Sequence, residues 1–564
     1  MTPSTAISRS PTAVRTSLCI GRCLVAVLLA TFAAGCASLP NNAGRARSTA
    51  LAAAADQTAL GRLVKERRQH DRAHSDSGFH LLASVDEAFS SRLALIQGAQ
   101  RTLDLQYYAI HADRSTEILL QALRDAARRG VRVRILLDDF NMVGKDAQVL
   151  RLAFEPNVQI RLFNPLPGSR RSLIGRLFTS VHDIDRIQKR MHNKLFIADN
   201  AIAIAGGRNL GDEYFGTDGK SNFVDTDVLA AGRVVTDMSA SFDRFWNDEL
   251  AYPMHALVSA EQLEQLRRAS NPLENEPGRR EAQPASAAAL PVARPTVLPN
   301  VTATVAITPA RQAMDLRTVP LIWAPALVLA DGPGKIAPNN DEADAGETVV
   351  DGLLALMHQA HRDVLIVSPY FVPGAAMLQV FKELHAKGVR VRVLTNSLAS
   401  TDAPAAHAGY ARYRKRLVAD GVELYEMRAM QSGDSGRLVS TALPGSGGGG
   451  SKSGVSRASL HSKALVIDHH LTVIGSMNLD LRSQRKNSEV ALLVRSGAFA
   501  RDATTQIERM LTQGAYHVEW RDGHLLWVAP AGSGVPDAHS EPDASMKLRL
   551  FVRLIAPFAP DEML

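Results

Sequence analysis

A pattern of histidine, lysine and aspartate, three side chains suited to acid–base and electrostatic catalysis, occurs twice in this sequence. The first copy is His192, Lys194 and Asp199, and the second is His461, Lys463 and Asp468. An asparagine follows each histidine at the same distance, at Asn209 and Asn478. Chance predicts the His-x-Lys-x4-Asp pattern only about 0.02 times in a chain of this composition. The repetition therefore favours a duplicated functional site over an exposed polar strand face.

Histidine and lysine two residues apart point to the same side of an extended chain, so we expect each His-x-Lys pair to lie on one face of a strand. Two such strands, one from each half, would place two imidazoles and two ammonium groups around one anion. This arrangement suits a phosphodiester, because fixed cations offset its charge while a neutral imidazole attacks phosphorus. Lys194 and Lys463 would supply the cations, and Asn209 and Asn478 would add N–H donors.

The duplicated motif, with Gly-Gly-x-Asn after one copy and Gly-Ser-x-Asn after the other, resembles the phospholipase D superfamily. Two such motifs form one active site in that superfamily. The segments RTLDLQYYAIH, GVRVRILLDD and GGRNLGDEYF are similar to the cardiolipin synthase C group of bacterial enzymes within it. This resemblance covers most of residues 78–270 and 348–530.

The resemblance implies a phosphohistidine intermediate, in which one imidazole attacks phosphorus while the other protonates the departing alcohol. Their order in the chain favours His192 as nucleophile and His461 as general acid and base, with the reverse assignment left open. The two imidazoles then need opposite protonation states, which predicts a bell-shaped pH profile. Asp227 and Glu489 could each orient an imidazole through its second nitrogen.

Other residues of the two motifs are expected to support this chemistry. We count Asp199 and Asp468 with the catalytic motifs but interpret them as chiefly structural. Ser476 stands where the first copy has Gly207, so only the second copy could bind phosphate through a hydroxyl. No closed set of metal ligands is evident, so we predict activity without a metal or other cofactor.

The resemblance favours a phosphatidyltransferase of cardiolipin synthase type, with phospholipids and a membrane surface as partners. A phospholipase D-type hydrolase that releases phosphatidic acid is the nearest alternative, because water can discharge the same intermediate. A nuclease is less favoured, since small superfamily nucleases resemble one half that dimerises, and no nucleic acid partner is expected. A non-catalytic envelope lipoprotein conflicts with two intact motifs. The net charge of +7 favours an anionic partner in any of these cases.

The N-terminus has the features of a bacterial lipoprotein signal peptide. Three arginines precede an apolar run at 23–35, which is too short to span a bilayer, and Ala33-Ala34-Gly35-Cys36 resembles a lipobox. We therefore predict a signal peptide at 1–36, lipidation of Cys36, and a lipid-anchored protein of the bacterial envelope that faces the periplasm. An uncleaved anchor is the alternative. All three cysteines lie in this segment, which leaves no disulfide framework in the mature chain.

Strands and helices alternate in the same order in both halves, which predicts two α/β units. Expected helices at 85–97 and 115–129 and strands at 102–110 and 131–137 correspond to helices at 349–361 and 375–386 and strands at 363–370 and 389–394. GVRVRILL and GVRVRVLT are the most similar pair. The predicted fold is two pseudo-twofold-related phospholipase D-like α/β-sandwich domains, at 78–270 and 347–530, that share one active site.

The remaining segments are expected to connect or flank these domains. Residues 37–77 would form a tether and a helix, and residues 431–458 a Gly/Ser-rich surface insertion or a flap. Residues 271–346 would form a Pro/Ala-rich linker or insertion, within which Asp315–Lys335 could return to the fold. The tail at 531–564 carries Lys547, Arg549 and Arg553 among apolar residues. Its period-two alternation favours a packed strand, and a membrane-interfacial segment is the alternative.

Overall fold

The computed structural model of the protein describes residues 39–50, 55–143, 146–167, 176–177, 180, 183–218, 221–258, 261, 312–337, 348–429 and 457–556. The predicted signal peptide with Cys36 lies outside the described residues. So do residues 271–311 and 338–346 of the predicted linker and residues 431–456 of the predicted insertion.

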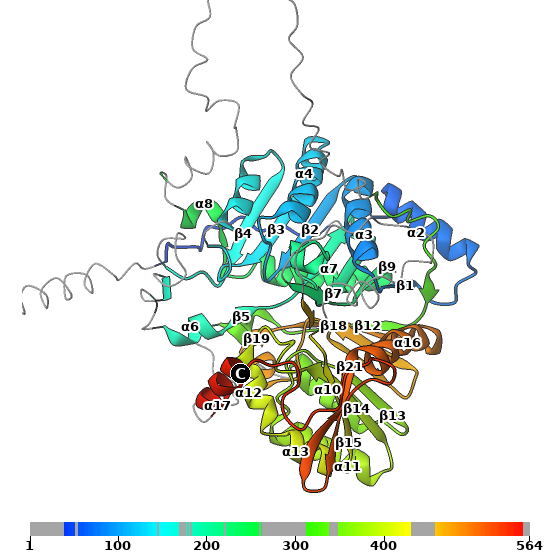
Figure 1. Ribbon diagram of the computed structural model, residues 1–564. Helices are drawn as coiled ribbons and strands as arrows, with labels where there is room; N and C mark the ends of the chain where they lie inside the picture. Colours follow the sequence, from blue (N-terminus) through cyan, green and yellow to red (C-terminus); the bar gives the residue numbers. More distant parts are fainter. Residues whose placement is uncertain are drawn as a thin grey trace, which may run out of the picture.

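The first half forms a nine-stranded mixed sheet with the order β10-β4-β3-β2-β6-β7-β9-β1-β11, drawn in the upper part of Figure 1. Strands β2, β3 and β4 are parallel, and the other neighbours pair antiparallel. Helix α3 starts with a capping box between Ser84 and Glu87, which satisfies two backbone N–H groups. The bounds are β1 Ser77–Leu82, β2 Thr102–Tyr107, β3 Arg132–Asp138, β4 Val158–Phe163, β6 Leu195–Ala198, β7 Ile202–Gly206, β9 Asp227–Gly232, β10 Ala251–Pro253, β11 Ile322–Trp323, α3 Val85–Gly98, α4 Arg114–Arg128, α7 Arg233–Trp246 and α8 Met254–Leu257.

The second half forms another nine-stranded sheet, with the order β12-β20-β18-β17-β13-β14-β15-β21-β22. Helix α10 begins with the same device as α3, a capping box between Thr348 and Asp351. The bounds are β12 Ala326–Ala330, β13 Asp363–Val367, β14 Arg390–Asn396, β15 Val422–Met427, β17 Ala464–Ile467, β18 Leu471–Gly475, β20 Val490–Arg495, β21 Ala515–Arg521, β22 His524–Val528, α10 Val349–His358, α11 Gly374–Ala386, α12 Pro404–Ala411, α13 Arg414–Ala419, α15 Leu481–Arg485 and α16 Gly497–Gly514.

These elements confirm the predicted pair of related α/β domains, and their ends differ from the expected ones by a few residues. Strand β2 ends at Tyr107 rather than at Ile110, and β13 ends at Val367 rather than at Tyr370. In both halves the chain leaves the sheet early and places a tyrosine, Tyr108 or Tyr370, in the wall of the pocket described below.

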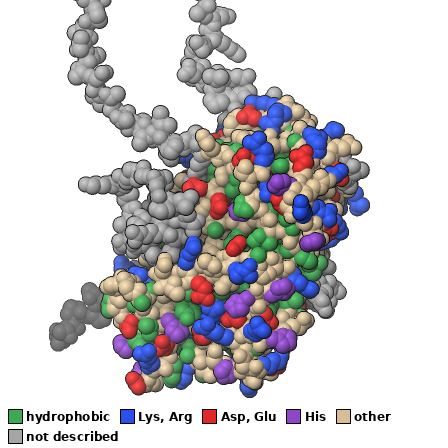
Figure 2. All heavy atoms as spheres, turned by 90° about the vertical axis from the view of Figure 1, so that its right-hand side faces the viewer, with side chains coloured by type: hydrophobic (Ala, Val, Ile, Leu, Met, Phe, Trp, Pro, Cys, Tyr) green, Lys and Arg blue, Asp and Glu red, His purple; other side chains and the backbone are tan. Residues whose placement is uncertain are grey.

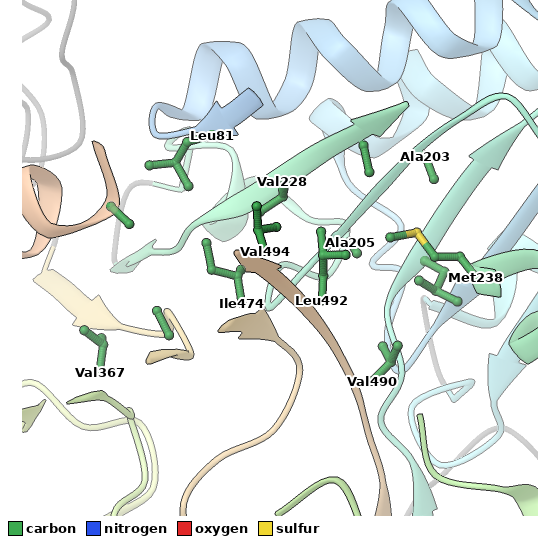
Figure 3. Close-up of a cluster of buried hydrophobic side chains, with 14 of the residues drawn as sticks. Leu81, Ala203, Ala205, Val228, Met238, Val367, Ile474, Val490, Leu492 and Val494 are labelled. Atoms are coloured by element: carbon green, nitrogen blue, oxygen red, sulfur yellow. The ribbon is translucent and has the colours of Figure 1, made fainter. Parts of the chain in front are cut away.

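The two sheets share one apolar layer. Ala205 of β7 and Val228 of β9 lie close to Ile474 of β18 and Leu492 of β20 in Figure 3, and all four belong to one buried cluster. Phe79 of β1 contacts Phe499 of α16 edge-on, with ring centroids 6.1 Å apart. Burial of apolar surface between the halves holds them in a fixed relation, which a site composed of both halves requires.

The described part of the predicted linker, residues 312–337, belongs to both sheets. Strand β11 pairs with β1 of the first sheet, and β12, three residues later, pairs with β20 of the second. This part therefore returns to the fold, as expected for residues 315–335, and does not form a free linker. Two edge strands accept its backbone hydrogen bonds, and sequence composition does not reveal such long-range partners.

The segment predicted as a tether begins against the first domain. The side chain of Asn42 donates to the Glu249 carbonyl at 2.7 Å, and the backbone N–H of Ala50 donates to Asp243 at 2.7 Å. The helix expected within 37–77 is present as α2, Ala59–His70. Residues 39–50 are thus attached to the domain surface rather than free.

The C-terminal segment is helical, so the packed strand predicted there is wrong. Helix α17, Met546–Ile555, is capped by Ser545, whose hydroxyl accepts the Leu548 N–H. Leu548, Val552 and Ile555 recur at helical spacing and pack on the second domain, which decides the helix over the alternating strand pattern. Across the ranges the structure describes, no helix has the length and apolar content needed to cross a bilayer.

Candidate active site

Two short parallel ladders join the halves directly before the two motifs. Strand β5, Arg190–Met191, pairs with β19, Asn487–Ser488, and β8, Ser221–Val224, pairs with β16, Arg457–Leu460. The ladders continue into the histidines, because His192 N–H donates to Ser488 O at 3.0 Å and His461 N–H donates to Val224 O at 2.9 Å. Each motif is therefore positioned by backbone bonds to the opposite half.

Side chains at the ends of two equivalent strands fix the residue before each histidine. Asp138, at the end of β3, accepts the Met191 N–H at 2.8 Å. Asn396, at the end of β14, accepts the Leu460 N–H at 2.9 Å and donates to the Leu460 carbonyl at 2.9 Å. Sequence reasoning missed this pair, although both residues close the duplicated strands GVRVRILLDD and GVRVRVLTN.

The His-x-Lys residues lie in the short connections that lead into β6 and β17, not in strands as predicted. Each lysine side chain donates a hydrogen bond to the backbone carbonyl of the histidine in the same motif. Lys194 Nζ donates to His192 O at 2.7 Å, and Lys463 Nζ donates to His461 O at 2.5 Å. These bonds replace ladder pairing and keep each ammonium group close to its imidazole. All four residues are buried.

Each imidazole is held by a carboxylate from the opposite half. His192 Nδ1 lies 3.0 Å from both carboxylate oxygens of Glu489, and His461 Nδ1 lies 2.6 Å from Asp225 Oδ2. A carboxylate only accepts hydrogen bonds, so we assign the proton of each neutral ring to Nδ1, which leaves Nε2 with its lone pair. The structure thus contains two crossed carboxylate–histidine pairs.

The prediction for Asp227 is wrong, because Asp225 occupies the position expected for it. Asp227 forms buried ion pairs with Arg92 Nη2 at 2.9 Å and Arg208 Nε at 3.1 Å. Strand register explains the difference: Gly206 pairs with Asp227 and the equivalent Gly475 pairs with Ala491, so Asp225 corresponds to Glu489. The sequence DTD offers two acids on one face of a strand, and only the pairing register distinguishes them.

Ser476 supports Glu489 rather than binding phosphate. Its hydroxyl donates to Glu489 Oε2 at 2.5 Å and accepts the Val490 N–H at 3.0 Å, and it is fully buried away from the pocket wall. At the equivalent position a Cβ on Gly207 would lie 2.7 Å from Asp225 Oδ1. Glycine at position 207 therefore leaves room for the carboxylate of Asp225, which is shorter than Glu489 and lies closer to its histidine.

The two motif aspartates organise the backbone. Asp199 accepts the N–H groups of residues 100, 101 and 102 at 2.7–2.9 Å. Asp468 accepts those of residues 361, 362 and 363 at 2.7–3.2 Å. Partial burial alone would raise the pKa of Asp468, but these N–H groups lower it. Asp199 holds the turn before β2 and Asp468 the turn before β13. Each aspartate follows the strand, β6 or β17, that its histidine precedes, so it lies at the opposite end of that strand from the histidine. This position agrees with the structural role expected for both.

The histidines line a pocket of about 330 Å³ at the junction of the two halves. Asn209 and Asn478 line it as well, and Asn209 Nδ2 donates to the Tyr214 hydroxyl at 3.0 Å. Of the other lining residues, the sequence singles out only Arg190, as part of a basic cluster before the first motif, because the rest lie outside the two motifs. These other lining residues are Tyr108, Arg190, Tyr214, Tyr370, Asp402, Ala403, Ala405, Ala406, Asp480, Arg482 and Asn487.

Burial determines the charge state of the histidines and lysines in the site. Burial lowers the pKa of His192 to about 4, and it lowers the pKa of His461 well below its usual value, with further lowering by Lys463. Burial also lowers the pKa of Lys194 to about 7 and that of Lys463 to about 8. Both imidazoles are therefore neutral near pH 7 without substrate, and a bound anion would raise all four pKa values.

The lysines beside the two histidines are the cationic groups of the site, and two acidic residues, Asp402 and Asp480, line the pocket. Asp402 accepts the Tyr370 hydroxyl at 2.8 and 2.9 Å. Burial raises the pKa of Asp480 to about 7, although Ser483 hydrogen bonds oppose the shift. Within the ranges that the structure describes, no three His, Cys, Asp or Glu side chains gather in a way that could hold a metal ion.

Two imidazoles held by crossed carboxylates, with two buried lysines beside them, define a phosphodiester-processing enzyme of the phospholipase D type. A model of the family described as "Cardiolipin synthase, PLD-like domain" matches residues 93–246 and 353–511, and the chain belongs to this family.

The similarity to known proteins extends over most of the chain. Cardiolipin synthase C of Escherichia coli is 34% identical over 491 residues, which cover 86% of this chain and 95% of the relative. Cardiolipin synthase A of Pseudomonas entomophila is 27% identical over 435 residues, which cover 76% of this chain and 67% of the relative. The crystal structure of phosphatidylserine synthase from Haemophilus influenzae superposes with a TM-score of 0.52 at 13% identity, covering 89% of this chain and 100% of that one. It shows the shared fold.

Proposed function

We propose that this protein is a phosphatidyltransferase of the cardiolipin synthase type, which joins phospholipids through a phosphohistidine intermediate. The crossed His192–Glu489 and His461–Asp225 pairs in one pocket carry this proposal. The similarity to cardiolipin synthase C along most of both chains supports the choice of substrate class.

In the first step, His192 Nε2 attacks the phosphorus of a phospholipid headgroup linkage, and the P–N bond forms as the P–O bond to the leaving alcohol breaks. His461 donates its Nε2 proton to the departing oxygen. The bound phosphodiester is anionic, so it raises the pKa of the imidazole beside it and allows His461 to carry that proton. Lys194 and Lys463 offset the charge on the phosphoryl oxygens as they lie beside the two rings.

In the second step, neutral His461 removes the proton from the hydroxyl of a second phospholipid. The hydroxyl oxygen attacks phosphorus, the P–N bond breaks, and His192 regains its lone pair. Glu489 stabilises the positive charge that His192 carries while it is phosphorylated, since the carboxylate lies 3.0 Å from Nδ1. Water in place of the lipid hydroxyl would give phosphatidic acid instead.

Lipid mass spectrometry of a cardiolipin-deficient bacterial host that expresses this protein tests the proposal. We expect cardiolipin with the wild-type protein and none with His192→Ala or His461→Ala. Phosphatidic acid without cardiolipin would establish hydrolysis and overturn transfer. Protein incubated with phosphorus-labelled lipid and denatured at alkaline pH, where a P–N bond to histidine survives, tests the assignment of roles. His192→Ala should carry no label, and label that persists there but disappears in His461→Ala would reverse the nucleophile.

We further propose that Cys36 is lipidated and holds the protein on an envelope membrane, facing the periplasm. Residues 39–50 run along the first domain, so an acyl chain at Cys36 would leave only a few residues between bilayer and fold. Labelled palmitate should enter the wild-type protein and not Cys36→Ser. Equal labelling of both would overturn this proposal, and proteolysis of intact spheroplasts tests the periplasmic orientation.

A further inference from the structure

Helix α17 carries an unusual concentration of exposed apolar side chains. Met546 is 78% exposed, Leu550 57%, Phe551 50% and Leu554 63%. These are four of the nine large hydrophobic side chains that are strongly exposed in the described residues. Leu548, Val552 and Ile555 pack inward, so the helix is apolar on both faces and only one face has a partner in the fold.

The exposed face also carries positive charge. Lys547 and Arg553 are exposed beside the apolar side chains, and the helix contains no acidic residue. Arg549 has a different role, because its Nη2 donates to the Glu541 carbonyl at 2.7 Å and its Nη1 to Ser540. An apolar face bordered by cations is complementary to the acyl boundary and anionic headgroups of a lipid surface.

The position of this helix relative to the pocket is fixed by buried charge. Glu541, just before α17, bonds Arg414 Nη2 at 3.1 Å, and Arg414 in turn bonds His407 of α12 at 2.8 Å. Helix α12 packs against α17 and, at its other end, places Ala405 and Ala406 in the pocket wall. The active-site pocket and the apolar face are thus connected by a single helix.

The same side of the molecule receives the N-terminal chain. Residues 41–45 lie against α8, and both α8 and α17 are at the left edge of Figure 1. Figure 2 shows the opposite, right-hand face, where hydrophobic side chains are scattered among interspersed acidic and basic ones. A lipid anchor that enters beside α8 would hold the α17 side toward the bilayer.

We propose that the exposed face of α17 docks on an anionic lipid surface and thereby places the pocket mouth next to membrane phospholipids. This inference rests on the proposed use of phospholipid substrates but concerns how they are reached. The cations border the apolar side chains, so binding needs both apolar insertion and anionic headgroups.

Vesicle sedimentation of the chain from Ala37 onward, which lacks both the apolar run at 23–35 and the lipidated Cys36, tests the docking. Vesicles contain equal parts of phosphatidylglycerol and phosphatidylcholine, or phosphatidylcholine alone. We expect Leu550→Ser/Phe551→Ser/Leu554→Ser to weaken binding to the anionic vesicles by at least about 100-fold. Lys547→Gln/Arg553→Gln should weaken it about 30-fold, and the parent should bind phosphatidylcholine vesicles much more weakly than the anionic ones. The matched control Ile118→Ser/Leu327→Ser, which removes exposed apolar side chains elsewhere, should bind as the parent does.

Turnover separates docking from chemistry. With short-chain, monomeric phospholipid the triple serine variant should match the parent, and with vesicles it should lose most of its activity. Parental vesicle affinity in the triple variant would overturn the docking proposal even if cardiolipin is made. A parent that dimerises through α17 in sedimentation velocity, and binds no vesicles, would also overturn it. Vesicle binding without cardiolipin formation would instead refute only the proposed function.

Discussion

Replacing Glu489 with glutamine tests the crossed carboxylate–histidine pair most directly. The carboxylate is fully buried, accepts from Ser476 Oγ at 2.5 Å and lies 3.0 Å from His192 Nδ1. If the new amide N–H faces the imidazole, the ring proton must move to Nε2, and the lone pair that attacks phosphorus is lost. If the amide oxygen faces the ring, the tautomer survives but the negative charge does not.

Either orientation should reduce kcat strongly. At 3.0 Å a carboxylate stabilises a positively charged imidazole by about 5 kcal/mol at an effective dielectric constant of about 20. The corresponding Asp-to-Asn change in a serine protease triad costs about 10⁴-fold in kcat. We therefore expect Glu489→Gln to lower kcat about 10²–10⁴-fold, or about 3–5 kcal/mol of transition-state stabilisation, with the fold retained.

Asp227→Asn is the matched control, because Asp227 is the acid that sequence reasoning placed at an imidazole. It breaks buried ion pairs with Arg92 and Arg208, so it should lower the free energy of unfolding by about 3–5 kcal/mol. The activity of the molecules that stay folded should change little. Steady-state kinetics and urea unfolding of both variants decide the matter. Retention of kcat within tenfold in Glu489→Gln would refute the role derived for the crossed pair.

Three further outcomes are expected. The alkaline limb of the pH profile should lie at higher pH for kcat than for kcat/KM. Without substrate, burial lowers the pKa of Lys194 to about 7 and that of Lys463 to about 8, and a bound phosphodiester raises both. Limbs at the same pH would contradict this. Asp199→Asn, which suits the left-handed backbone there (φ 52°), should lower the free energy of unfolding by about 1–3 kcal/mol and leave kcat within a few-fold. Activity should survive dialysis against EDTA, since Lys194 and Lys463 already supply the cationic charge; loss restored by one added metal would argue against it.

The sequence by itself determined the chemistry and the general architecture. Two copies of a His–Lys–Asp–Asn spacing identify the reacting groups, because the spacing is local and needs no knowledge of distant partners. The alternation of apolar strands and amphipathic helices likewise depends on neighbouring residues, so the duplicated α/β elements were predicted to within a few residues.

Tertiary structure alone decided which acid meets which histidine. Asp225 precedes β9 and Asp227 begins it, and residues two apart lie on the same side of an extended chain, so only the register between β7 and β9 selects Asp225. The crossing of each pair between halves depends on ladders that join residues roughly 240–300 positions apart.

Long-range packing also settled the two flanking segments. Residues 322–323 and 326–330 form strands because two sheet edges supply hydrogen-bond partners, and the sequence indicates a return to the fold there without identifying those partners. The C-terminal segment became a helix because Leu548, Val552 and Ile555 found an apolar surface on the second domain, although Lys547-Leu548-Arg549-Leu550 alternates as a strand would. Where a segment's sequence is compatible with both a helix and a strand, it adopts the structure whose apolar side chains the rest of the fold can bury. The sequence of the segment alone does not contain that information.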